Sequence, residues 1–172
     1  MVVIGGYSRG DVLSDIEALK IDEDGINCEP TDLPYRVANH ASVYTPVLDG
    51  ILTCGGNDEN WNYLSKCIIL RRGNDSNHFP ALNSKRSGLS LTSISDTIYA
   101  IGGHPNRNTM ETINLNTDKQ WKQEELPFSV KYHCSVRLGN KLIVTGGIDE
   151  NENVTGGVWE FGNVSKIILK ST

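Results

Sequence analysis

The residues of this chain best suited to acid–base chemistry near neutral pH are its four histidines: His40, His78, His104 and His133. Catalysis would require one of them beside a nucleophile or a carboxylate, and a metal site would require several ligands at a suitable spacing. His40 and His133 each precede a small residue and a serine, in His40-Ala41-Ser42 and His133-Cys134-Ser135. This recurrence favours a structural or binding role over catalysis. No spacing predicts a metal site or a cofactor, and we expect neither.

The four cysteines show no CxxC motif and no Cys/His metal spacing: Cys28, Cys54, Cys67 and Cys134. Each lies in an apolar stretch, which predicts reduced, buried thiols. Reduced thiols indicate a cytoplasmic location.

A third candidate for chemistry is the acidic stretch from Asp149 to Asn153. It has some likeness to a calcium-binding loop but lacks the glycine at the sixth position and the closing glutamate. We therefore expect a solvated loop.

The composition describes a folded, mildly acidic chain. Its 172 residues include 16 Lys and Arg against 21 Asp and Glu, a net charge of −5. With 38% hydrophobic residues it is too apolar for intrinsic disorder. The acidity gives no attraction to phosphate, and no apolar run approaches the length of a membrane helix, so neither nucleic acid nor membrane is expected as a partner. The unusual count is 17 glycines.

Eight of these glycines form four Gly-Gly pairs spaced 50, 47 and 44 residues apart: Gly5-Gly6, Gly55-Gly56, Gly102-Gly103 and Gly146-Gly147. Each pair closes a short apolar run rich in β-branched or aromatic residues, which predicts a buried strand. Two-residue turn signals precede three of the runs and predict tight hairpins: Asp49-Gly50, Asp96-Thr97 and Gly139-Asn140. The pattern predicts a repeated antiparallel unit of about 47 residues.

Two further strands complete each unit. The third strand is predicted after a polar loop, at Ile16 to Ile21, Cys67 to Leu70, Met110 to Leu115 and Val158 to Phe161. The fourth is clearest at Trp121 to Pro127 and is echoed at Cys28 to Pro34. Four antiparallel strands per unit are typical of a β-propeller blade.

The chain resembles the kelch-repeat family over essentially its whole length. In that family an apolar strand ends in Gly-Gly and is followed by an aromatic residue and then a tryptophan. The third repeat fits best, because the run from Ile98 to Gly103 is followed by Trp121, with Leu115 at the tyrosine position. Phe161 keeps an aromatic residue there in the fourth repeat. The resemblance implies an all-β, kelch-type β-propeller fold.

At this repeat length the chain makes about 3.7 four-stranded blades, and kelch propellers close with about five to seven. We expect one kelch-repeat region over 1–172, with a partial blade at 1–35 and further blades at 36–84, 85–130 and 131–172. Because the first blade begins at its second strand, fifteen strands are expected. The result would be an open arc, an incomplete propeller with two exposed edges. It would be either a fragment of a longer protein or a chain that self-associates through its open sheet edges.

The family resemblance gives the glycine pairs a structural role, ending the second strand of each blade. The competing interpretation, a phosphate-binding loop, requires GxGxxG or a following Lys-Ser or Lys-Thr, and no pair has one. Trp121 and Trp159 lie on predicted strands and are expected to pack in the core. Trp61 lies in a polar loop, where a large aromatic residue often anchors a partner.

In kelch-like propellers the loops between second and third strands, and those between blades, gather on one face and bind the partner. Here the first set is 7–14, 57–65, 104–109 and 148–156, and the second is 35–40, 83–88 and 128–133. These loops supply the candidate partner-binding residues Tyr7, Arg9, Arg36, His40, Trp61, Tyr63, Arg86, His104, Asn106, Arg107 and Tyr132. Arg36 and Arg86 each open a blade, with Lys131 as the third counterpart. Arginines beside aromatic residues suit an acidic protein or peptide.

The sequence thus favours a non-enzymatic module that recognises a protein or peptide partner. By resemblance it would be the substrate-recognition part of a cullin-type ubiquitin ligase adaptor, which would also need an N-terminal dimerisation domain. Two alternatives stay open at this point: an actin-associated kelch protein, and a propeller enzyme of the oxidase or sugar-acid isomerase type.

Overall fold

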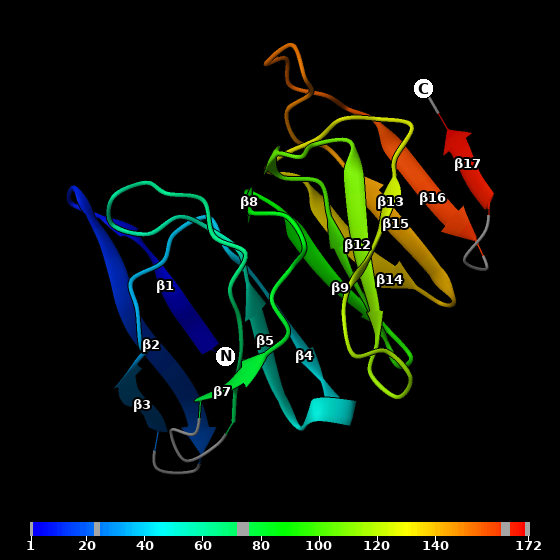
Figure 1. Cartoon of the computed structure of the whole chain (residues 1–172). Helices are drawn as coiled ribbons and strands as arrows, with labels where there is room; N and C mark the ends of the chain where they lie inside the picture. Colours follow the sequence, from blue (N-terminus) through cyan, green and yellow to red (C-terminus); the bar gives the residue numbers. More distant parts are fainter. Residues whose placement is uncertain (1, 23–24, 72–75, 163–165, 171–172) are drawn as a thin grey trace.

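The structure of the chain, a computed structural model, describes residues 2–22, 25–71, 76–162 and 166–170 and consists of four successive antiparallel sheets (Figure 1). The first sheet has three strands, β1 (Val2–Ser8), β2 (Asp11–Asp22) and β3 (Gly25–Asp32). The second has four strands, β4 (Ala41–Thr45), β5 (Gly50–Cys54), β6 (Cys67–Leu70) and β7 (Ser76–Phe79). The third contains β9 (Ser90–Ile94), β10 (Thr97–Ile101), β12 (Thr109–Asn114) and β13 (Lys122–Glu125). The fourth contains β14 (Cys134–Leu138), β15 (Lys141–Thr145), β16 (Val158–Gly162) and β17 (Lys166–Lys170).

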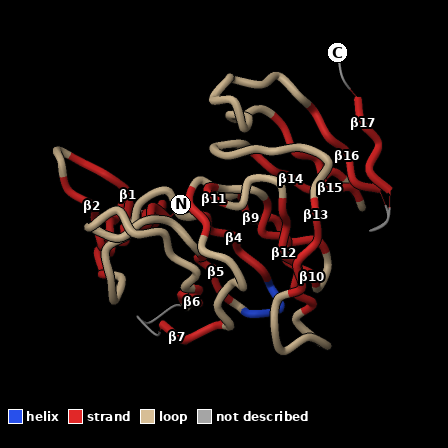
Figure 2. Tube along the Cα trace, turned by 45° about the horizontal axis from the view of Figure 1, so that its top comes forward, coloured by secondary structure: helices blue, strands red, loops and turns tan. Residues whose placement is uncertain are grey.

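These sheets confirm the expected all-β, kelch-type arrangement, three strands followed by three times four. Two short strands, β8 (Arg86–Ser87) and β11 (His104–Pro105), pair with each other beside the third sheet. We refer to the four sheets as blades 1 to 4. Strand β9 lies beside both β4 and β14, so the first strands of blades 2, 3 and 4 are neighbours (Figure 2). In the described ranges blade 4 does not pair with blade 1, and the array is an open arc. No helix in the described part of the chain is long and apolar enough to cross a membrane.

Blade 1 corrects two predictions. The pair Gly5-Gly6 does not end its strand, because β1 continues through it to Ser8, with a register irregularity between Ile4 and Gly6. The predicted loop 7–14 is a tight hairpin in which only Arg9 and Gly10 leave the strands, both at positive φ. Strand β2 begins earlier than predicted because this places Val12 in the core, where it is 3% exposed and its burial is favourable.

Two of the three predicted two-residue turns also differ from the turns in the structure. Strand β4 ends at Thr45, and a short 3-10 turn over Pro46–Leu48 leads to Asp49 in the left-handed region, which makes a four-residue loop. Pro46 suits the first position of that turn. The hairpin of blade 3 turns at Ser95 and Asp96, one residue earlier than expected. The Gly139-Asn140 turn of blade 4 is confirmed by the pairing of Leu138 with Lys141.

Successive blades are joined by a close backbone contact that repeats three times. The backbone of Arg86 donates to the carbonyl of Leu64 at 2.9 Å and accepts from the N–H of Gly56 at 2.8 Å. Val37 and Val130 make the same pair of bonds to blades 1 and 3. We call these three residues the docking residues: Val37, Arg86 and Val130. All three are fully buried.

The first glycine of the pair is required by this contact in blades 1, 2 and 3. A Cβ on Gly55 would lie 2.6 Å from the carbonyl oxygen of Arg86, and one on Gly5 would lie 2.6 Å from that of Val37. Gly146 is different, because the nearest atom to its Cβ position is 4.0 Å away. Gly146 belongs to blade 4, which has no following blade among the described residues. The first glycines of blades 1 to 3 therefore allow a close backbone contact, and Gly146 lacks that contact among the described residues.

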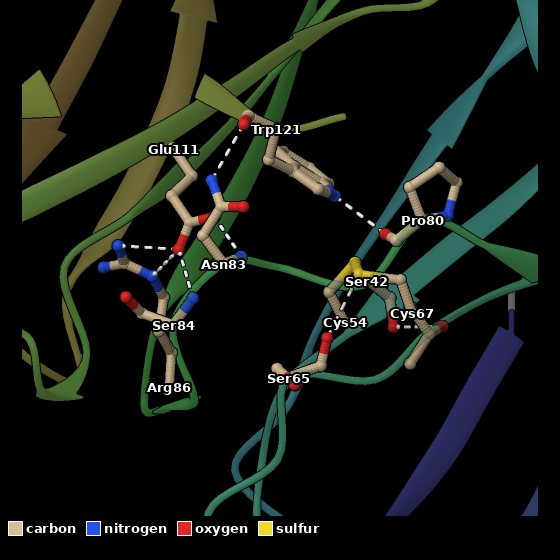
Figure 3. The surroundings of a disulfide bond; sticks show 11 residues. Ser42, Cys54, Ser65, Cys67, Pro80, Asn83, Ser84, Arg86, Glu111 and Trp121 are labelled. Carbon is tan, nitrogen blue, oxygen red and sulfur yellow. Dashed lines mark hydrogen bonds and ion pairs between the residues drawn. A yellow bond between two sulfur atoms is a disulfide. The ribbon is translucent and has the colours of Figure 1, made fainter. Parts of the chain in front are cut away.

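Three apolar clusters fill the spaces between the blades. The cluster between blades 2 and 3 is the largest and includes Leu52, Ile98 and Trp121. The indole of Trp121 is 4% exposed and donates to the carbonyl of Pro80 at 2.8 Å (Figure 3). Trp159 stacks on Phe128, with ring centroids 4.0 Å apart. Both tryptophans therefore have the packing role that the sequence predicted.

The cysteine prediction was wrong for three of the four residues. Cys54 and Cys67 are directly opposite each other on β5 and β6 and form a disulfide (Figure 3). Cys134 is a free thiol but is exposed. The side chain of Cys28 lies outside the described residues. Because two cysteines are oxidised in the structure, the premise of reduced thiols no longer supports the cytoplasmic expectation.

Replacing a repeat glycine by alanine tests the docking contact, with a matched control at the open end. Gly55 and Gly146 have nearly equal φ values of +70° and +69°, so both alanine variants carry the strain of a left-handed residue, about 1 kcal/mol. Only Gly55→Ala also clashes with a backbone carbonyl, so we expect it to cost about 3 kcal/mol in the free energy of unfolding. Urea denaturation followed by tryptophan fluorescence measures both. Equal losses in the two variants would contradict the docking role.

Candidate functional site

The loops that follow the second strand of each blade lie at one edge of the sheets (Figure 1). We call this edge the loop face; it comprises Tyr7 with the β1–β2 turn, the loops 55–66, 102–108 and 146–157, and the interblade residues Lys131 and Tyr132. Its side chains make contacts that each cross from one blade to the next. These contacts change in kind along the array, from aromatic at blade 1 to ionic at blade 4.

The first contact joins blades 1 and 2 through two exposed aromatic rings. Tyr7 is 56% exposed and Trp61 is 52% exposed, and their ring centroids lie 5.5 Å apart. Trp61 occupies the left-handed region, at φ 63°, within its loop. Two large rings that pack together and still face solvent are a surface suited to an apolar or aromatic partner group.

The second contact joins blades 2 and 3. The ring of Tyr63 lies edge-on to His104, with centroids 5.1 Å apart. His104 accepts a hydrogen bond at Nδ1 from Arg107 at 3.2 Å, and burial together with the nearby Arg107 charge lowers the pKa of His104. His104 is therefore neutral at physiological pH and connects the aromatic part of the face to the ionic part.

Two loops of the face have the same sequence pattern and the same fold. They are Asp58-Glu59-Asn60-Trp61-Asn62 and Asp149-Glu150-Asn151-Glu152-Asn153. In each loop the aspartate carboxylate accepts two backbone N–H bonds, at 2.9 Å and 2.9 Å for Asp58 and at 2.8 Å and 2.9 Å for Asp149. Trp61 and Glu152 are equivalent, since both have φ near 60° and donate their N–H to the carbonyl of the loop aspartate. The stretch from Asp149 to Asn153 is thus a defined turn.

The third contact joins blades 3 and 4 through Glu152. Its carboxylate lies 2.5 Å from the Arg107 guanidinium and 2.8 Å from the Lys131 ammonium. Hydrogen bonds from Lys131 and Arg107 lower the pKa of Glu152 to about 2, so the carboxylate is charged at all physiological pH values. Arg107 is also fixed by a bond to the carbonyl of Asp149 at 2.6 Å.

Tyr132 belongs to the second set of loops, where blades begin. Asn39, Gly88 and Tyr132 occupy the same repeat position, all at positive φ, and are linked by N–H bonds from Gly88 to Asn39 and from Tyr132 to Gly88. The Tyr132 ring is 52% exposed, and a Cβ on Gly88 would collide with it. This ring is therefore held in place and available to a partner.

Arg86 cannot contact a partner, which corrects its prediction as a binding residue. Its side chain has no solvent exposure and pairs with the equally buried Glu111, with Nη2 and Oε1 3.0 Å apart (Figure 3). It also donates to the carbonyls of Gly102 and Thr109, at 2.8 Å and 3.0 Å. The predicted series of basic residues was misaligned, because the repeat equivalents of Arg86 are the docking residues Val37 and Val130.

The remaining predicted residues lie apart from these contacts. Arg9 is exposed at the β1–β2 turn, and Arg36 is exposed with one bond to the carbonyl of Val12 at 3.3 Å. Asn106 is half-buried, and its carbonyl accepts a bond from Arg86 at 3.2 Å. His40 is half-buried, and a Cβ on Gly5 would lie 3.4 Å from its ring.

In the described part of the chain, His40 and His133 lack the partners that a catalytic histidine needs. His133 lies 2.7 Å from the Ser90 hydroxyl through Nε2, the one serine–histidine pair in the described part of the chain. Its Nδ1 and that of His40 have no hydrogen-bond partner among the described residues, so no carboxylate orients either ring. Burial lowers the pKa of each to about 4, which makes both poor bases at neutral pH. Their equivalent contacts with Gly5 and Gly102 fit a repeated packing role.

Two residues of the loop face were missed as site residues, Glu152 and Lys131. The signal for Glu152 was present in the sequence, because the pattern Asp-Glu-Asn-x-Asn occurs twice. Aligning the two copies places Glu152 opposite Trp61, which was recognised. No sequence signal pairs Lys131 with Glu152, since that contact depends on the fold.

Comparison with known proteins points to poxvirus proteins named for kelch repeats. The chain is 29% identical over 127 residues to the Kelch repeat and BTB domain-containing protein 2 of Cowpox virus, covering 72% of this chain and 22% of that protein. It is 30% identical over 93 residues to the Kelch repeat protein B10 of Vaccinia virus, covering 49% of this chain and 54% of that protein. The matches thus span about half or less of the relatives' length. No family model matches the chain.

Removing Arg86 is expected to destabilise the protein, whereas removing the exposed Arg36 is not. Arg86→Met leaves the Glu111 carboxylate buried and unpaired, which costs about 3–5 kcal/mol. Arg36→Ala is expected to change the free energy of unfolding by less than about 0.5 kcal/mol. Urea denaturation monitored by circular dichroism measures both variants. Glu111→Gln should lower the free energy of unfolding by a similar amount to Arg86→Met. If both of these variants changed it as little as Arg36→Ala, the buried pair would be unimportant for stability.

Proposed function

We propose that this chain, which is built from kelch repeats, is a non-enzymatic module that binds a protein or peptide partner on its loop face. The observation that carries the proposal is the exposure of large aromatic rings that the backbone holds in place. Tyr7, Trp61 and Tyr132 are each more than half exposed. Aromatic side chains of this kind supply much of the binding energy in protein interfaces.

The rigidity of the face supports recognition of a partner. Trp61 and Tyr132 have left-handed backbones, and the N–H of Trp61 donates to Asp58 within its own loop while that of Tyr132 donates to Gly88 of the preceding blade. A side chain that is already ordered loses less conformational entropy when a partner binds. The chemistry of the histidines supports the non-enzymatic part of the proposal, because neither His40 nor His133 has an orienting carboxylate or a pKa near neutrality.

We further propose that the bound partner is a substrate for a cullin-type ubiquitin ligase. The support is the name of one relative, a Kelch repeat and BTB domain-containing protein, which places kelch repeats and a second domain in one chain. In this arrangement the loop face would select the substrate.

Affinity capture from a cell extract followed by mass spectrometry tests whether the aromatic rings of the loop face bind a partner. The double variant Tyr7→Ala/Trp61→Ala is expected to lose at least about 2 kcal/mol of binding energy, roughly a thirtyfold drop in affinity, for a specific partner. Tyr44→Ala is the matched control: Tyr44 is 59% exposed but lies at the opposite end of blade 2, beside the β4–β5 turn.

Partners retained by Tyr44→Ala and lost by the double variant would support the proposal. Partners retained by both variants would place binding elsewhere and contradict it. Recovery of a cullin with the full-length protein would support the ligase hypothesis, and its consistent absence there would count against that hypothesis alone.

We also propose that the open ends of the array self-associate. The support is that β1, unlike its equivalents β5, β10 and β15, has a strand on only one side in the described residues, and that Gly146 has no neighbour at its Cβ position. Unpaired strand edges readily accept a strand from another molecule. In blades 1 to 3 the glycine equivalent to Gly146 faces a backbone carbonyl of the following blade. The position of Gly146 can therefore accommodate a backbone carbonyl.

Size-exclusion chromatography with light scattering tests this proposal against the chain mass of 18.9 kDa. We expect a mass above that of the monomer that rises with concentration. Val3→Lys places a charge on the β1 edge and should reduce association, whereas Val154→Lys, in an 87% exposed loop position, should not. A monomer at every concentration would overturn the proposal.

A further inference from the structure

The ionic end of the loop face has the features of a binding site for a carboxylate that comes from outside the chain. Two cations from different blades converge there, Arg107 from blade 3 and Lys131 from blade 4. Their side chains are only 12% and 15% exposed, whereas the carboxylate that they hold, Glu152, is 60% exposed. The cations are therefore part of the framework, and the carboxylate is the outer member.

The Arg107 side chain and the Lys131 backbone are both held by groups other than Glu152. Arg107 donates to the Asp149 carbonyl at 2.6 Å and to Nδ1 of His104 at 3.2 Å. The backbone of Lys131 is bonded in both directions to Ile148, at 3.0 Å and 2.8 Å. Removing the Glu152 carboxylate would leave two nearly covered cations facing the same point on the surface.

The position that supplies the carboxylate is the one that varies between the two matching loops. Trp61 and Glu152 share a backbone conformation, and each contacts a side chain of the preceding blade. The loop is built by the aspartates and asparagines around this position, so the residue there can change without changing the loop. A glutamate at this position thus supplies a charge that the loop itself does not need.

We propose that Arg107 and Lys131 form a site for an aspartate or glutamate side chain of an acidic partner segment, and that Glu152 is an internal ligand which the partner displaces. This deepens the proposed function, on which it rests, by assigning the charged part of the partner to blades 3 and 4. The bonds that lower the pKa of Glu152 to about 2 are those that the incoming carboxylate would take over. An exposed ion pair of this kind is weak enough to exchange.

The test compares two variants that remove one negative charge from the same loop. Glu152→Gln frees the cations, and Glu150→Gln is the control, because Glu150 contacts the Ser129 hydroxyl at 3.2 Å and neither cation. The probe is a fluorescein-labelled hexaglutamate peptide, followed by fluorescence anisotropy, with hexaglutamine as the uncharged comparison. Glu152→Gln is expected to bind hexaglutamate about three- to tenfold more tightly than either Glu150→Gln or the unmodified chain.

Adding Lys131→Gln to Glu152→Gln should abolish the gain, with the thermal midpoint of each variant confirming that it is folded. Equal affinities for Glu152→Gln and Glu150→Gln would overturn the proposal, as would a gain that survives Lys131→Gln. Displacement of the peptide by inorganic phosphate at a lower concentration than by glutarate would assign the cations to phosphorylated segments and overturn the carboxylate assignment. Because the probe needs no natural partner and no aromatic contact, this result is independent of the capture experiment on Tyr7 and Trp61.

Discussion

The structure depends on one repeated backbone contact, in which a docking residue at the start of each blade lies directly on the glycine pair of the blade before it. The carbonyl of Val37, Arg86 or Val130 accepts a hydrogen bond from the second glycine, and the absence of a Cβ on the first glycine lets the two backbones approach. This contact sets the distance and angle between blades. The three apolar clusters, the interblade hydrogen bonds and the loop face all follow from that spacing.

Arg86 shows how this contact is linked to the binding face. At the position where the other blades have valine, its guanidinium turns into its own blade and bonds the carbonyls of Gly102, Asn106 and Thr109, while Glu111 neutralises its charge. The carbonyls of Gly102 and Asn106 belong to the loop that carries His104 and Arg107, and Thr109 follows that loop directly as the first residue of β12. A buried charge with a full set of partners is costly to disrupt, so it holds that loop in one conformation. The buried Arg86–Glu111 pair thus fixes the loop of blade 3 that carries His104 and Arg107 on the surface.

The fold was largely predictable because its main determinants are local. Glycine pairs that require positive φ and short apolar runs can be recognised in a sequence, and they located three of the four blades well. One of the failures comes from a register that differs by one residue. Counting Arg36, Arg86 and Lys131 as equivalent placed Arg86 at the surface, whereas its true equivalents Val37 and Val130 are buried; a shift of one residue along an extended backbone reverses the side chain's direction. The oxidised pair Cys54 and Cys67 was missed because their adjacency arises only when β5 and β6 pair.

The two matching loops explain how one scaffold can carry different surface chemistry. In both, the conformation is set by an aspartate that bonds the backbone N–H groups two and four residues later, so the side chain of the residue between those two groups makes none of these bonds. At this position the Trp61 side chain packs on Tyr7, and the Glu152 side chain binds Arg107 and Lys131. The same backbone therefore presents an apolar contact at one end of the face and an ionic contact at the other. Because each contact bridges two blades, the contacts follow one another along the loop face from blade 1 to blade 4, and a partner extended along it would meet aromatic rings first and cations last.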